Sequence, residues 1–144
     1  MPKALNMDFS RPANASYLSV VTPATHDMST LRGWWLEDKN VTQKFFNQEL
    51  RQGGPAPASC EAWVSREIVR QHLESPAMWS IFQLQDLLGM DEALRRPDVA
   101  AERINVPGES HFYWRYRMHL TLEALGKAEN FNRLLENMVR QSGR

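Results

Sequence analysis

Two short apolar runs are the strand-like segments of the chain, and a long helical stretch separates them. Residues 17–22 form a β-branched run that stops at Pro23, and residues 78–84 form the second run. The near-continuous apolarity of the first run is typical of a strand covered on both faces of a parallel sheet. Two parallel strands joined by helices are the unit of an α/β sheet, but two strands alone leave both edges open. The sequence therefore predicts an α/β chain that is mostly helical and carries an incomplete parallel sheet.

Helical patterns account for most of the remaining sequence. The predicted elements, in chain order, are an irregular lead-in over residues 1–16, helices from Ser29 to a stop at Gly53 and from Ser59 to Leu73, a short helical turn at residues 87–88, a surface loop over residues 89–113, and helices over residues 114–125 and 128–141. Ser59 is expected to act as an N-cap and Gly126 as a C-cap. We treat residues 17–144 as one segment.

The charge balance and the cysteine content argue against several classes of protein. With 17 Lys and Arg against 17 Asp and Glu among 144 residues, the chain lacks the basic excess of a nucleic-acid or membrane-surface protein. No apolar run approaches the roughly 18 residues of a membrane span. The single cysteine, Cys60, permits no intrachain disulfide and favours a reducing compartment. We therefore expect a cytoplasmic protein in which Cys60 is a buried, inert thiol.

The residues with the most chemical potential are His26 and Asp27, directly after the first predicted strand. Ligand-binding and catalytic residues gather at the carboxyl ends of parallel strands. An imidazole donor beside a carboxylate acceptor can hold hydroxyl groups or steady developing positive charge. Taken alone, the dipeptide is more typical of a structural role, in which His26 caps the strand and Asp27 caps the next helix.

Other residues give weaker signals. His111 and His119 lie eight positions apart without a further ligand at metal-binding spacing, so no metal site is predicted, and nothing indicates a cofactor. Residues 111–117 interleave aromatic side chains with arginines, a pattern that can stack nucleic-acid bases. Because the net charge is zero, we favour sugar rings or core packing as the partners of these aromatics, including Trp114.

Several segments together resemble one enzyme family. Residues 19–35 read Ser-Val-Val-Thr-Pro-Ala-Thr-His-Asp-Met-Ser-Thr-Leu-Arg-Gly-Trp-Trp, residues 82–89 read Phe-Gln-Leu-Gln-Asp-Leu-Leu-Gly, residues 102–108 read Glu-Arg-Ile-Asn-Val-Pro-Gly, and the likeness continues over residues 111–122. In this order and spacing they are similar to conserved regions of the 4-alpha-glucanotransferases, the amylomaltases or disproportionating enzymes of glycoside hydrolase family 77. Within the family, the chain resembles the C-terminal portion of the large cytosolic type.

The resemblance implies the last two strands, with their helices, of a (β/α)8 TIM barrel that carries out retaining transglycosylation on maltooligosaccharides or other α-glucans. Such chemistry uses a carboxylate nucleophile and a carboxylic acid/base about 5–5.5 Å apart. The family pattern maps Asp27 onto a third carboxylate that stabilises the transition state. It maps His26 onto a donor to a sugar hydroxyl, and Asn105 onto a loop residue near the donor sugar. Trp34 and Trp35 are expected to pack the following helix rather than touch glucan.

The resemblance also implies that essential groups lie elsewhere. The nucleophile and acid/base belong to earlier barrel strands, and Asp8 is the only carboxylate before Asp27. A complete barrel needs about 250 residues, so we expect a fragment that is inactive by itself. Its open strand edges predict contact with the remaining barrel segment or self-association. A non-catalytic carbohydrate-binding module and a helical interaction module stay open as alternatives.

Overall fold

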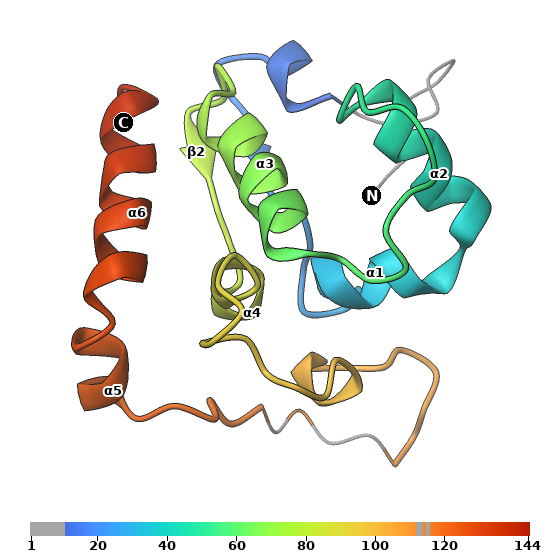
Figure 1. The fold of residues 1–144 in the computed structure, drawn as a ribbon, viewed down its shortest axis with the longest axis vertical. Helices are drawn as coiled ribbons and strands as arrows, with labels where there is room; N and C mark the ends of the chain where they lie inside the picture. Colours follow the sequence, from blue (N-terminus) through green and yellow to red (C-terminus); the bar gives the residue numbers. More distant parts are fainter. Residues whose placement is uncertain (1–10, 112–113, 115) are drawn as a thin grey trace.

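The computed structural model describes residues 11–111, 114 and 116–144, and the chain within them is mostly helical (Figure 1). The elements, in chain order, are the 3-10 helix η1 (Pro12–Asn14), strand β1 (Val20–Val21), helices α1 (Leu31–Glu37), α2 (Lys39–Gln48) and α3 (Ala62–Leu73), strand β2 (Trp79–Ser80), helix α4 (Leu84–Leu88), the 3-10 helix η2 (Ala100–Glu102), and helices α5 (Leu122–Gly126) and α6 (Glu129–Gln141). Most of the predicted lead-in, residues 1–10, lies outside the described residues.

The two predicted strands pair in parallel. Val20 lies opposite Trp79 and Val21 opposite Ser80, and α1, α2 and α3 form the connection between them. Further backbone hydrogen bonds extend the contact on both sides, from Met78 N to the carbonyl of residue 17 and from residue 81 to that of Val21. The prediction of a parallel pair with a helical crossover is therefore confirmed.

Both strands expose apolar side chains. Val20 and Trp79 are 54% and 61% exposed, and Leu18 and Ile81 beside them are also exposed. A strand that is apolar in sequence is normally covered by neighbouring elements. Within the described residues, the two-stranded sheet thus has the open edges and uncovered apolar surface that the sequence predicts.

The first hydrophobic cluster joins α1, α2 and α3. Its buried members are Leu31, Trp35, Phe45, Phe46, Leu50, Cys60, Val64 and Ile68, with Trp34 packed against them. Trp35 is fully buried, and its indole N–H donates to the carbonyl of Pro57 at 2.9 Å. The expectation that both tryptophans pack the helix after β1 is confirmed.

The helical stretch that begins near Ser29 is two helices rather than one. Asp38 stands between them in an extended conformation, and its carboxylate accepts from the backbone N–H groups of Asn40 and Val41. Aspartate is a favoured N-cap because its side chain satisfies N–H groups that lack a partner within the helix. The side chain of Asp38 therefore starts α2 where the hydrophobic spacing alone suggested continuity.

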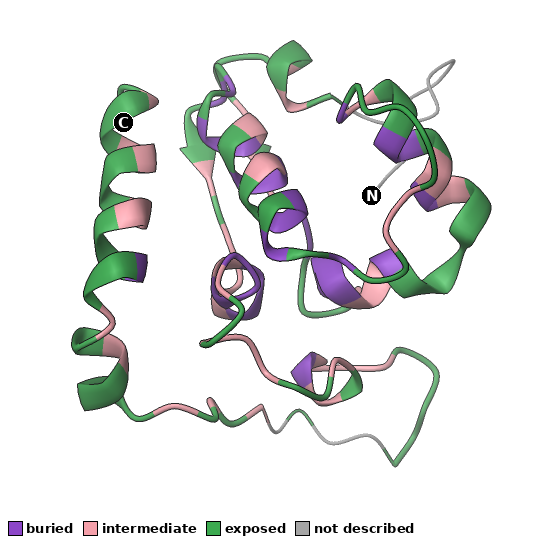
Figure 2. Cartoon of the chain, viewed as in Figure 1, coloured by how far each residue is buried: buried purple, intermediate pink, exposed green. Residues whose placement is uncertain are grey.

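The predicted N-cap at Ser59 is wrong by two residues. Glu61 occupies the N-cap of α3, with an extended backbone and no side-chain capping hydrogen bond. Cys60, just before this N-cap, is buried in the core and lies 3.4 Å from the hydroxyl of Ser65. In Figure 2, buried residues gather on α3, which lies at the centre of the fold.

The second hydrophobic cluster joins α3 and α4 to the C-terminal helix α6. Its buried members are Val69, Leu73, Leu88, Met90 and Phe131. Leu135, Met138 and Val139 continue this face along α6, as the sequence predicts for residues 128–141. The opposite face of α6 is exposed, so this helix is held by one apolar stripe (Figure 2).

The predicted helix over residues 114–125 is wrong over most of its length. Helix α5 begins only after Thr121, whose hydroxyl accepts from Ala124 N at 3.1 Å. Gly126, the predicted C-cap, is instead the last residue of α5. The C-cap is Lys127. The described residues between η2 and Thr121 belong to a long connection that runs from η2 to α5 (Figure 1). His119 in this connection contacts the carbonyl of Leu94 instead of continuing a helix.

Candidate functional site

His26 and Asp27 lie in the loop between β1 and α1, at the carboxyl end of the first strand. A turn closed by a hydrogen bond from Met28 N to Thr25 O presents both side chains to solvent, where each is about half exposed. The two side chains face each other, with 3.4 Å between His26 Nε2 and Asp27 Oδ2. Asp27 does not cap the next helix, because Thr30 fills the N-cap of α1 and accepts from Gly33 N. The structural interpretation of Asp27 as a helix cap is therefore wrong.

Asn105 contacts Asp27 although the two residues are far apart in the sequence. Its side-chain amide donates to Asp27 Oδ1 at 2.7 Å, a contact across 78 positions of sequence. Asn105 follows the 3-10 helix η2, so the loop after η2 and the loop after β1 meet at this hydrogen bond. The three residues singled out from the sequence lie together in the structure.

Trp114 completes this group of side chains. Its ring centroid lies 4.8 Å from that of His26, with the planes inclined by 49°, and the residue is 61% exposed. Phe112, Tyr113 and Arg115, which belong to the same aromatic and arginine-rich segment, lie outside the described residues. We call His26, Asp27, Asn105 and Trp114 the strand-end cluster.

The strand-end cluster can bind a polyhydroxylated ligand. An ionised carboxylate accepts several hydrogen bonds, and one lone pair of Asp27 Oδ1 is already occupied by Asn105. Both side chains are about half exposed, so hydroxyl groups can reach the carboxylate of Asp27 and the imidazole of His26. An exposed indole such as Trp114 offers an apolar face with a polar edge. This combination suits a sugar ring better than it suits a metal ion.

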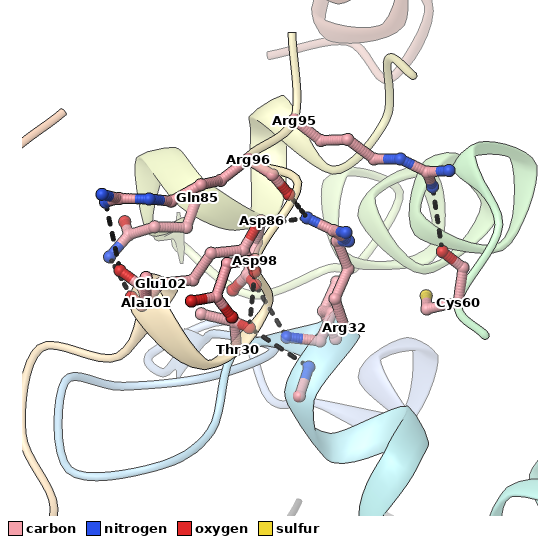
Figure 3. A network of polar contacts seen from close by, with 12 residues as sticks. Thr30, Arg32, Cys60, Gln85, Asp86, Arg95, Arg96, Asp98, Ala101 and Glu102 are labelled. Carbon is pink, nitrogen blue, oxygen red and sulfur yellow. Dashed lines mark hydrogen bonds and ion pairs between the residues drawn. The ribbon is translucent and has the colours of Figure 1, made fainter. Parts of the chain in front are cut away.

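A second set of polar residues lies next to the strand-end cluster but is buried. Its members, drawn in Figure 3, are Thr30, Arg32, Gln85, Asp86 and Glu102, and we call them the buried network. Arg32 forms an ion pair with Glu102 Oε1, and Thr30 donates to Glu102 Oε2 at 3.0 Å. Gln85 donates to the carbonyl of Glu102 at 3.1 Å, so α4 also holds this residue.

Burial alters the acid–base properties of the two carboxyl groups in the network. Burial raises the pKa of Asp86 to about 7, although its Oδ1 accepts from Leu31 N at 2.8 Å, and the negative charge of Glu102 adds to the increase. Asp86 Oδ2 is buried and has no hydrogen-bond partner among the described residues. Burial also raises the pKa of Glu102, against the lowering effect of Arg32.

Sequence reasoning missed the buried network. Arg32 sits beside Leu31 in a helical pattern, and a charged residue at such a position usually faces solvent. Its partner Glu102 is 70 positions away, and hydrophobic periodicity carries no information about such a contact. The one available signal was that Glu102 belongs to the same motif as Asn105.

The structure also bears on the cysteine and on metal binding. Cys60 is buried, as predicted, and burial raises the pKa of its thiol to about 11. Within the described ranges, no three His, Cys, Asp or Glu side chains are grouped so that they could hold a metal ion. Nor does any helix in the described part of the chain have the length and apolarity to span a membrane.

Comparison with known proteins gives a consistent picture. A family model described as 4-alpha-glucanotransferase matches residues 1–122. The chain is 37% identical over its whole length to the 4-alpha-glucanotransferase DPE2 of Oryza sativa subsp. japonica. It is 33% identical over 120 residues, 83% of the chain, to the 4-alpha-glucanotransferase of Chlamydia trachomatis. The amylomaltase from Streptococcus agalactiae in complex with acarbose superposes with a TM-score of 0.67 and 20% identity over 92% of the chain.

These relatives are much longer than this chain. The match covers 15% of the Oryza protein, 22% of the Chlamydia protein and 23% of the Streptococcus structure. The likeness to the solved structure concerns the fold, while the sequence matches concern descent. With its family model matching most of the sequence, this chain belongs to the 4-alpha-glucanotransferase family.

Proposed function

We propose that this chain is the C-terminal barrel segment of a 4-alpha-glucanotransferase and supplies one corner of its sugar-binding site. The observation that carries the proposal is the hydrogen bond from Asn105 to Asp27, which brings two separate family motifs together at the end of β1. The parallel pair β1 and β2, crossed by helices, supports its assignment to the last two strands of a (β/α)8 barrel. A cytosolic location accords with its single buried cysteine.

Asp27 would act on the developing positive charge of the sugar. In retaining glycoside chemistry, the transition state resembles an oxocarbenium ion, and hydrogen bonds to ring hydroxyls strengthen as it forms. Asp27 would accept from such hydroxyls, while Asn105 holds the carboxylate in a fixed orientation through Oδ1. His26, which faces Asp27, would donate to a neighbouring hydroxyl.

The nucleophile and the acid/base would come from the other strands of the barrel. The exposed apolar side chains of β1 and β2 support this arrangement, because strands of a complete barrel would cover Val20 and Trp79. When no such strands are present, the same surface would drive self-association. Maltose supplied to the purified 144-residue chain should therefore yield no glucose or maltotriose. Release of either product would contradict the proposed division of the site.

Binding of acarbose to the purified chain tests the role of Asp27. Acarbose is an oligosaccharide with a secondary amine that is positively charged when protonated, so an acceptor carboxylate should favour it over an uncharged maltooligosaccharide of the same length. Asp27→Ala should remove this preference, whereas Glu136→Ala, which removes an exposed carboxylate on α6, should keep it. An unchanged preference in Asp27→Ala would exclude the proposed role.

A non-catalytic carbohydrate-binding module is the second candidate, and the exposed Trp114 beside His26 favours it. In such a module, stacking on the indole supplies most of the binding. Affinity for maltooligosaccharide would then survive Asp27→Ala and be lost in Trp114→Ala. Loss of affinity in both variants would favour the glucanotransferase segment, and no binding by the wild-type chain would favour a helical interaction module.

A further inference from the structure

The exposed hydrogen bond between Asn105 and Asp27 is too weak to hold the two loops together by itself. The Asp27 side chain is 52% exposed, and a hydrogen bond in water replaces bonds that each group can make with solvent. The two residues are also 78 positions apart, so the chain gives them little tendency to meet. Another contact must hold the two loops together.

The buried Arg32–Glu102 ion pair, drawn in Figure 3, joins the same two parts of the chain as this hydrogen bond, because it links α1 to the end of η2. Their side chains are only 9% and 2% exposed. Thr30, also buried, donates to the second carboxylate oxygen of Glu102, so both oxygens are engaged. Ion pairs and hydrogen bonds shielded from water are stronger and more sharply oriented than exposed ones.

The spacing along the chain links the buried pair to the exposed hydrogen bond. Asn105 follows Glu102 by three positions, and Asp27 precedes Thr30 by three. Three residues span at most about 10 Å even when fully extended. Fixing Glu102 against Thr30 therefore brings Asn105 much closer to Asp27 than 78 positions of free chain would, although each tether alone leaves some freedom. Gln85 adds a second anchor, because it donates to the backbone carbonyl of Glu102 at 3.1 Å.

We propose that Arg32 and Glu102 are positioning residues of the sugar-binding site, which hold Asn105 on Asp27 through their buried ion pair. The proposal rests on the proposed function of the strand-end cluster, because positioning matters to catalysis only if Asp27 acts on sugar. Neither Arg32 nor Glu102 needs to touch the ligand. Their effect passes through the orientation of Asn105.

The side-chain amide of Asn105 reports this positioning directly. In a ¹⁵N-labelled chain without glucan, its hydrogen-bonded proton should lie downfield of a free amide proton, and Asp27→Ala should remove the shift. Glu102→Gln keeps the shape of the side chain but removes its charge, and it should cause the same loss. Glu67→Gln, which disrupts an exposed ion pair with Arg70, should leave the resonance in place.

A second control separates positioning from general destabilisation. Phe131→Leu weakens the second hydrophobic cluster and should lower the thermal midpoint without moving the Asn105 resonance. If Glu102→Gln does not fold, Glu102→Asp and Arg32→Lys keep both charges and shift their positions, and each should move the resonance toward its free value. A folded Glu102 or Arg32 variant with a wild-type Asn105 resonance would overturn the proposal. Because no sugar is present, that result is distinct from a failure of glucan binding.

Discussion

The strand-end cluster and the buried network are both polar and share two loops, yet only the first is open to solvent. In the cluster, the side chains of Asp27 and His26 are each about half exposed. In the network, Glu102 is almost inaccessible, and both of its carboxylate oxygens are engaged. The difference fits the proposed role of the cluster in binding a sugar. Groups that must meet a ligand are left available, and their orientation is set by buried groups behind them.

The comparison predicts first that the two kinds of ion pair differ greatly in their effect on stability. Arg32→Met leaves Glu102 buried without its cation and should reduce the free energy of unfolding by about 3–5 kcal/mol. Arg70→Met breaks exposed pairs with Glu67 and Glu74 and should cost about 1 kcal/mol or less. Urea unfolding of both variants measures the difference. Equal losses would mean that the Arg32 pair is as weak as a surface pair.

The next effect concerns pH and belongs to Asp86 in the buried network. Its pKa is raised by burial to about 7, so between its unfolded pKa of about 4 and pH 7 the folded state binds more protons than the unfolded state. The contribution of Asp86 to stability is complete below pH 4 and is lost as the pH rises to 7, by up to about 4 kcal/mol. Asp86→Asn should therefore flatten the dependence of unfolding free energy on pH over this range.

Asp86→Asn must be compared with the wild-type protein because His72 also affects how the free energy of unfolding depends on pH. Burial lowers the pKa of this histidine, so its contribution to stability has the opposite sign and is lost as the pH falls. The difference between Asp86→Asn and wild type cancels the effect of His72, because the histidine is present in both proteins. Parallel curves for the two proteins would contradict the assignment of a raised pKa to Asp86.

The smallest change in stability is expected in the strand-end cluster. Asp27→Ala and Asn105→Ala each remove one exposed hydrogen bond and should alter the free energy of unfolding by about 1 kcal/mol or less. Both should nevertheless impair binding of a sugar. Thermal unfolding and a maltooligosaccharide titration on the same samples check the two halves of this prediction. A large loss of stability in either variant would mean that Asp27 and Asn105 stabilise the fold instead of serving a ligand.

The sequence predicted the elements that depend on local pattern. The apolar stripe of α6, the parallel pairing of β1 with β2 and the burial of Cys60 all follow from spacing and composition. The helix predicted over residues 114–125 failed because Thr121 caps a later start and His119 bonds to a distant carbonyl. Capping and tertiary contact outweighed helix propensity there.

The candidate site was predicted only in its exposed part. His26, Asp27 and Asn105 stood out because they belong to recognisable motifs, and the structure brings them together. The buried network could not be predicted because it depends on a contact between Arg32 and Glu102, which lie 70 positions apart in the sequence. A charged residue in an amphipathic pattern looks the same whether it faces water or a buried partner.

A residue-by-residue map of acarbose binding tests the central claim most directly. Titration of the ¹⁵N-labelled chain should shift the resonances of Asp27, Asn105, His26 and Trp114 more than any others, and Asp27→Ala should weaken these shifts. That result would identify the strand-end cluster as a sugar-binding corner. Acarbose shifts confined to other parts of the chain, or the same shifts at His26 and Trp114 in Asp27→Ala, would contradict the account.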